Sequence, residues 1–153
     1  MKWQRMDPQG GLYIPMACRD QFYYLRTKRQ WRYIIYKISE FDFESVEVDK
    51  CGLRDSSFEE FQHSLPENEA RWAVYDFEYT ITEYGLESRK SKMLFIVYSP
   101  DSNTNSKEKN TILFNKNTLK KKIFSRQEMN KNLMEYTAYS KTEIDFETIK
   151  ERL

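Results

Sequence analysis

Side chains able to act as nucleophile, proton carrier or metal ligand are few and scattered in this sequence. His63 is the single histidine among 153 residues, and the two cysteines, Cys18 and Cys51, do not form a Cys-x-x-Cys pair. A metal centre requires several such ligands, and a catalytic cysteine requires a neighbouring base. The sequence therefore predicts no metal site and no nucleophilic catalysis. We expect His63 at the surface or its boundary, and Cys18 on the buried face of a helix.

Asp76 and Glu78 are spaced as a pair of catalytic carboxylates would be on one strand. Residues two apart in a strand point to the same face, so the two side chains lie together. The same spacing is typical of an ion-paired or solvated strand surface, which we favour. The sequence contains no Gly-rich phosphate loop, His-Glu-x-x-His or Gly-x-Ser-x-Gly motif. We therefore predict that the chain is not an enzyme and has no catalytic residues and no cofactor.

Clusters of lysine and arginine are the remaining candidates for function. A run of charge is usually a solvated face, but a basic cluster also suits an acidic protein surface, a phosphoinositide headgroup or a nucleic acid. The net charge of +1 argues against nucleic acid. The clusters are Arg89, Lys90 and Lys92, then Lys107 and Lys109, and then Lys120, Lys121 and Lys122.

Composition and length indicate one soluble domain. Charged residues make up 32% of the chain and aromatic residues 16%, which suits a solvated surface around an aromatic core. The N-terminal segment is polar and lacks the apolar stretch of a signal peptide, and the apolar run 93–98 is too short to cross a bilayer. Together with the two unpaired cysteines, these features predict a cytoplasmic protein without a transmembrane segment.

Hydrophobic periodicity predicts the elements that position these residues. Segment 81–91 is predicted to be a polar turn region centred on Tyr84 and Gly85, which joins two strands as a long-looped hairpin. A capping box at Ser56 or Ser57 begins the second helix. The resulting fold class is α/β (α+β), a mixed five-stranded sheet flanked by helices on both faces. The first expected helix has roughly a dozen residues, with Cys18, Phe22 and Leu25 on one face. The other expected helices are 57–65, 107–124 and 142–153, and the expected strands are 31–38, 43–48, 71–80, 92–99 and 133–138.

Segments spread over nearly the whole chain resemble, in order, the motifs of the actin-depolymerising factor (ADF)/cofilin family. The resemblance implies the ADF-homology (gelsolin-like) fold over 10–153, with 1–9 as a flexible extension. Independently, Pro8, Gly10 and Gly11 predict that 1–11 is a loose arm. It also implies a monomeric protein that binds actin monomers and filaments and promotes filament severing and depolymerisation. The matching segments are 29–37, 65–76, 95–101, 106–109, Lys116, 119–123 and 142–145 with Ile149 and Arg152.

The same resemblance implies three groups of binding residues. Actin is acidic, so lysines would supply steering and register in the first two groups. The monomer-binding group is Gly11, Leu12, Tyr13, Ile14, Lys107, Lys109 and Asn110; the filament-binding group is Arg89, Lys90, Lys92, Glu151 and Arg152; the phosphoinositide-binding group is Lys120, Lys121 and Lys122.

The sequence also departs from the family pattern. Gly10 stands where the family has a regulatory serine, so control by phosphorylation there is not expected. Asn110 stands where the family has a methionine that contacts actin, and one residue is inserted between Asp101 and Lys107. Two alternatives remain beside the severing factor. One is a non-severing relative that binds the Arp complex, as glia maturation factor-like proteins do. The other is a basic module for lipid or nucleic acid.

Overall fold

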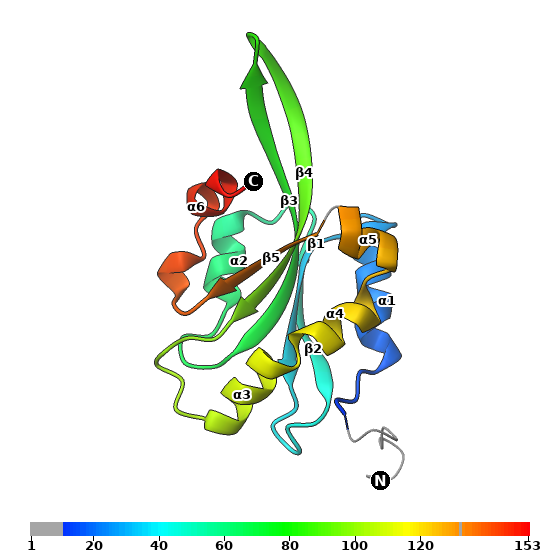
Figure 1. Ribbon diagram of the computed structural model, residues 1–153, viewed down its shortest axis with the longest axis vertical. Helices are drawn as coiled ribbons and strands as arrows, with labels where there is room; N and C mark the ends of the chain where they lie inside the picture. Colours follow the sequence, from blue (N-terminus) through cyan, green and yellow to red (C-terminus); the bar gives the residue numbers. More distant parts are fainter. Residues whose placement is uncertain (1–10, 132) are drawn as a thin grey trace.

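A mixed β-sheet forms the centre of the molecule (Figure 1). The computed structural model describes residues 11–131 and 133–153, so the predicted extension 1–9 and Gly10 lie outside the described residues. Within them the sheet has five strands in the order β2-β1-β3-β4-β5, antiparallel except for the parallel pair β4 and β5. The strands are β1 (Trp31–Ile38), β2 (Val46–Leu53), β3 (Arg71–Glu83), β4 (Leu86–Tyr98) and β5 (Leu133–Ala138).

Helices cover both faces of this sheet, as predicted. On one face Cys18, Leu25, Ile112, Leu119 and Ile123 pack against one side of the strands. On the other face, α2 and α6 complete a second apolar cluster rich in aromatic rings. The helices are α1 (Met16–Arg26), α2 (Phe58–Ser64), α3 (Ser106–Phe114), α4 (Lys116–Ile123), α5 (Arg126–Lys131) and α6 (Phe146–Glu151), with a 3-10 turn at Lys141–Glu143.

Strand β1 matches its prediction in both bounds and burial. Ile34 and Tyr36 enter the cluster beneath α1, whereas Tyr33 and Ile35 enter the cluster beneath α2. A strand buried on both faces needs apolar residues at both parities, which is the pattern that the sequence shows. The two cores therefore share β1 as a common wall.

Strand β2 begins later than predicted, at Val46 rather than at residue 43. Phe43 has a φ of 54°, a left-handed conformation that a strand does not accommodate. The Asp42 carboxylate accepts hydrogen bonds from the backbone N–H groups of Glu44 and Ser45, at 2.9 and 3.2 Å. This side-chain capping makes 39–45 a turn, and β2 then pairs with β1 as far as Leu53.

The prediction that 81–91 is a polar turn region is wrong, because most of this segment is strand. Strands β3 and β4 pair along 13 residues each, and Glu83 is the partner of Leu86. Tyr84 and Gly85 alone make the turn, with φ values of 54° and 77°. Two consecutive left-handed residues match the twist of a tight hairpin. The outer half of this hairpin projects beyond the body of the molecule (Figure 1).

The single long helix predicted over 107–124 is also wrong, because Asn115 divides it into α3 and α4. Asn115 has φ −109° and ψ 14°, and its side-chain amide donates to the carbonyl of Thr111 at 3.0 Å. Asparagine competes in this way with the helical backbone, and it ends α3. Helix α5 was not predicted. The cap of α2 is Ser57, whose hydroxyl accepts from the Glu60 N–H at 3.1 Å.

Gly52 lies directly against a buried ring. A Cβ at this position would lie 2.0 Å from a carbon of the Tyr33 ring. That ring is stacked 6.1 Å from Tyr75 and lies 5.0 Å from Phe61, so it has no room to withdraw. β2 therefore needs a residue without a side chain here.

Candidate functional site

The lysines at the start of α3 are presented to solvent by a buried carboxylate between them. Glu108 accepts hydrogen bonds from the backbone N–H of Ala70 at 2.8 Å and from the side chain of Asn103 at 2.9 Å. Its burial fixes the rotation of α3 about its axis, so Lys107 and Asn110 face outward and Lys109 lies half-buried at the edge. The helix also begins with a cap, since the Asn105 side chain accepts from the Glu108 N–H.

The N-terminal segment lies at the same end of the molecule as this part of α3. Tyr13 donates its N–H to the carbonyl of Glu44 at 2.8 Å and accepts from the Val46 N–H at 2.9 Å. The Lys107 ammonium is 5.6 Å from the centre of the Phe43 ring, so the turn 39–45 connects the segment with α3. We call Gly11, Tyr13, Lys107, Lys109 and Asn110 the α3 surface.

Two residues of the predicted monomer-binding group are not on this surface. Leu12 and Ile14 are buried, and both belong to the apolar cluster beneath α1. Leu12 and Ile14 therefore belong to the folded core rather than to a loose arm. The alternation of buried Leu12, exposed Tyr13 and buried Ile14 is the pattern of a strand edge, which the segment begins to form beside Ser45.

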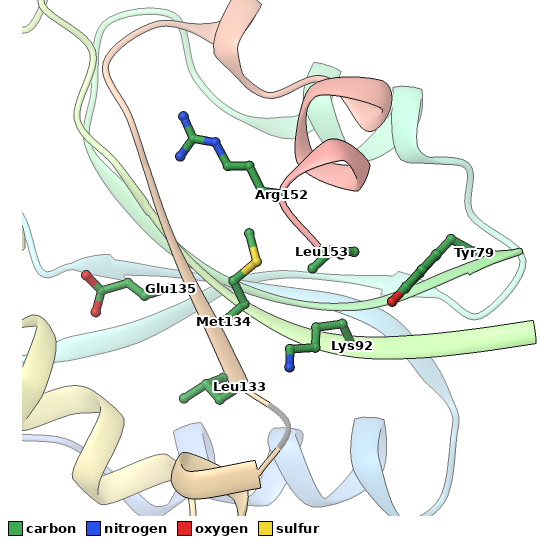
Figure 2. A pocket seen from close by; sticks show the side chains of 7 residues that line it. All are labelled: Tyr79, Lys92, Leu133, Met134, Glu135, Arg152 and Leu153. Carbon is green, nitrogen blue, oxygen red and sulfur yellow. The ribbon is translucent and has the colours of Figure 1, made fainter. Parts of the chain in front are cut away.

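The second group joins residues from the hairpin and from the end of α6. Lys92 and Arg152 line one open cavity of about 470 Å³ together with Tyr79, Leu133, Met134, Glu135 and Leu153. Figure 2 shows Met134 between Arg152 and Lys92, with Tyr79 at the hairpin side. The Arg152 guanidinium also stacks 5.0 Å from the Tyr136 ring. The sequence did not single out Met134 or Tyr79, although Tyr79 shares its parity with the core residue Phe77.

The hairpin residues of this group do not all share one face. Lys90 is opposite Tyr79 and Lys92 is opposite Phe77, which places both lysines on the side of the cavity. Arg89 is opposite Thr80 and points to the other face, with its guanidinium 3.8 Å from the Glu78 carboxylate. We call Lys90, Lys92, Glu151 and Arg152 the hairpin surface, and Arg89 lies outside it.

The predicted phosphoinositide group is divided by an ion pair. Lys120 and Lys116 donate to the two oxygens of Glu135 at 2.8 and 2.7 Å, and Lys120 also lies 5.9 Å from the Phe95 ring. Lys120 is therefore engaged within the fold, whereas Lys121 and Lys122 are exposed. Lys120 thus differs from its two neighbours because β5 places a carboxylate beside it, and phosphoinositide binding by this group stays a prediction.

Glu135 is expected to make folding stability sensitive to acid. Burial opposes its ionisation, but the hydrogen bonds from Lys116 and Lys120 outweigh this effect and hold its pKa below the ordinary value of 4.5. A carboxyl group whose pKa is lowered by folding stabilises the native state above its unfolded pKa, and this contribution is lost as the pH falls through the folded value.

Glu135→Gln should therefore reduce stability at neutral pH and flatten the loss of stability below about pH 4.5. Urea unfolding of both proteins at about pH 7 and about pH 3 measures this difference. The same change at the exposed Glu59 serves as the control. Equal pH dependence of Glu135→Gln and the wild type would contradict the assignment.

The carboxylates Asp76 and Glu78 are ion-paired, as favoured from the sequence. The Arg54 guanidinium donates to Asp76 at 2.7 Å and to Glu78 at 3.1 Å, and Arg32 donates to Glu78 as well. The hydrogen bond from Arg32 is the largest influence on Glu78, and it lowers the pKa of that carboxyl group. Both carboxylates thus belong to a structural ion-pair network between β1, β3 and the residue that follows β2.

The other candidate groups are placed as the sequence indicated. His63 is exposed on α2, and Cys18 is 1% exposed on the buried face of α1. Burial raises the pKa of the Cys18 thiol to about 12 and that of Cys51 to about 11. Among residues 11–131 and 133–153 there is no cluster of three or more potential metal ligands. Nor does that part of the chain include a helix long and apolar enough to span a membrane.

Comparison with known proteins decides the family. The family model described as cofilin/tropomyosin-type actin-binding protein matches residues 11–153. The chain belongs to the ADF/cofilin family. An actin-depolymerizing factor of Vitis vinifera is 36% identical over 152 residues, which are 99% of this chain and 99% of that protein. The match to the ADF/cofilin family model covers all residues of the three predicted binding groups.

Solved structures share the ADF/cofilin fold with this chain. A cofilin from Streptomyces griseoflavus superposes with a TM-score of 0.75 at 24% identity, covering 93% of this chain and 96% of that one. A glia maturation factor from Caenorhabditis elegans reaches 0.66 at 18% identity, covering 94% and 96%. At these identities the likeness shows the ADF/cofilin fold alone, so function has to be argued from the surfaces.

Proposed function

We propose that this protein binds actin monomers and filaments in the cytoplasm and promotes filament severing and depolymerisation. Membership of a family of actin-binding proteins supports this proposal. The observation that carries it is the start of α3, where Glu108 is buried, Lys107 is exposed and Lys109 is half-buried at the edge. Lysines held in register by a rigid helix suit an acidic protein surface.

The two surfaces have separate roles in this proposal. The α3 surface binds the monomer, and the hairpin surface adds contacts that exist only in the filament. They lie at opposite ends of the molecule (Figure 1), which supports contact with two actin subunits at once. No covalent bond is made or broken. A protein that binds one arrangement of filament subunits more tightly than another shifts the filament toward that arrangement and weakens its subunit contacts.

The exposed pair Lys121 and Lys122 on α4 is proposed to bind phosphoinositide headgroups. Lys120 takes no part, because Glu135 and the ring of Phe95 already hold its ammonium group. Two lysines near an anionic membrane surface contribute about 1 kcal/mol each.

Imaging of single actin filaments with the purified protein tests the proposal. Severing events that increase with protein concentration are expected, together with co-sedimentation of protein and filaments. A chain that leaves both filaments and monomers unchanged at micromolar concentration would refute it. A chain that binds another actin regulator and leaves filaments intact would instead be a non-severing relative.

Charge reversal on the hairpin surface is expected to separate its role from that of the α3 surface. Lys90→Glu with Lys92→Glu should weaken filament binding by about tenfold to a hundredfold, because both lysines lie on the same face of the sheet and Lys92 lines the cavity beside Arg152. Monomer affinity should stay within about twofold of the wild type. Co-sedimentation with filaments and titration of monomers measure the two effects. Equal loss in both assays would contradict the assignment of two surfaces.

A further inference from the structure

The outer face of α3 ends in a large aromatic side chain that is left open to solvent in the described chain. Phe114 is 79% exposed, whereas Ile112 on the opposite face is fully buried. The Trp72 indole N–H also donates to the Ile112 carbonyl at 3.0 Å. Because Ile112 and Glu108 both anchor the same side of α3, the helix cannot roll to bury Phe114. Single exposed aromatic side chains are common on protein surfaces, so a binding role for Phe114 depends on its position beside Lys107 and Asn110.

Phe114 continues the line of the α3 surface. It lies four residues after Asn110 and seven after Lys107, so the three side chains share one helical face. Asn115 ends α3 at the next residue by donating to the Thr111 carbonyl. The exposed face therefore begins with a lysine and ends with an aromatic ring, with a polar amide between them.

We propose that Phe114 is the apolar anchor of the α3 surface and inserts into an apolar recess of the actin monomer. This inference rests on the proposed function and specifies how the monomer is recognised. Lys107 binds the acidic rim of the same recess, which fixes the direction in which α3 lies on actin. A helix laid into a groove draws its affinity from apolar side chains on one face.

The choice of Phe114 over its neighbours follows from exposure and chemistry. Asn110 is exposed but offers an amide that would have to be desolvated, so it contributes little apolar area. Leu113 is half-buried and packs against the core beneath α1. Aromatic residues dominate the free energy of protein interfaces, and Phe114 is the most exposed apolar side chain on α3.

The test compares Phe114→Ser and Phe114→Leu with the wild type in binding to ADP-actin monomers that cannot polymerise. Phe114→Ser should weaken binding by about 30-fold, and Phe114→Leu by about fivefold or less, because leucine keeps most of the apolar contact. Leu53→Ser removes a 60% exposed apolar side chain at the far end of β2 and serves as the matched control, with affinity unchanged.

Salt dependence distinguishes an apolar anchor from an electrostatic effect. The ratio of wild-type to Phe114→Ser affinity should stay constant between about 50 and 300 mM salt, whereas the ratio for Lys107→Ala should shrink. Phe114→Ser binding within about twofold of the wild type would overturn the inference. If Lys107→Glu abolished binding in that case, the proposed function would stand. If the wild-type protein bound no monomer, both the inference about Phe114 and the proposed function would be refuted.

Discussion

Replacing Lys107 and Lys109 together by glutamate is expected to abolish the binding of actin monomers. Both side chains extend from the first turn of α3, and the carboxylate of Glu108 between them points inward to Ala70 and Asn103. Reversal removes two attractions and adds two repulsions toward an acidic partner. The loss should reach about 4 kcal/mol, or roughly a thousandfold in affinity. Titration of labelled ADP-actin monomers measures it.

The matched control for this reversal changes the net charge equally at a distance from α3. Lys28 and Lys50 are exposed on the chain after α1 and on β2, and their double replacement by glutamate should leave monomer affinity within about threefold of the wild type. Thermal melting of both variants should match, because none of the four lysines is buried. If both double variants lost affinity equally, global charge rather than the α3 surface would explain binding.

Gly52→Val is expected to cause the largest loss of stability. Even a Cβ at residue 52 would lie 2.0 Å from the Tyr33 ring, and the Tyr33 hydroxyl is bound to Ser64 at 3.1 Å. The ring lies between Phe61 and Tyr75 and cannot move without disturbing the aromatic cluster beneath α2. Relief of the clash requires β2 to shift from β1. A loss of about 3 kcal/mol or more follows, equivalent to roughly 10 °C in Tm.

Chemical denaturation measures this loss, and Gly85→Ala supplies the comparison. Gly85 has open space around its Cα but a φ of 77°, so alanine there causes backbone strain without a clash. Its cost should be about 1 kcal/mol. Combining Gly52→Ala with Tyr33→Leu should cost less than the sum of the two single changes, because the ring that clashes is absent. Full additivity would contradict the steric explanation.

The sequence predicted those elements whose residues carry a strong periodic signal. β1 and β5 have the predicted bounds, and Ser57 caps α2 as the capping box indicates. The hairpin was predicted, but the strand structure of its outer half was missed because that half is largely exposed on both faces, so no alternation marks residues 81–91 as strand. In this segment the strand structure depends on the backbone pairing between β3 and β4. The turn residues Tyr84 and Gly85 were the one feature of the local sequence that indicated the hairpin.

The candidate surfaces were predicted in outline, but their details depend on tertiary contacts. A run of lysines gives no sign that Glu135 will hold Lys120, because their partnership requires β5 to lie beside α4. In the same way, Leu12 and Ile14 look like an apolar arm until the backbone of Tyr13 is seen bound to Glu44 and Val46. The sequence pattern does not show which partner an exposed polar residue will have. Sequence reasoning can therefore identify a group of candidate binding residues, but only the fold shows which of them are exposed and which are engaged in internal contacts.

The protection of both thiols makes this protein convenient for fluorescence work. With pKa values near 12 and 11, Cys18 and Cys51 are protonated at neutral pH and react slowly with maleimides. A cysteine introduced at the exposed residue His63 would therefore take a dye selectively. That position is on α2, across the sheet from the α3 surface, so a labelled molecule can be followed while its docking lysines remain unmodified.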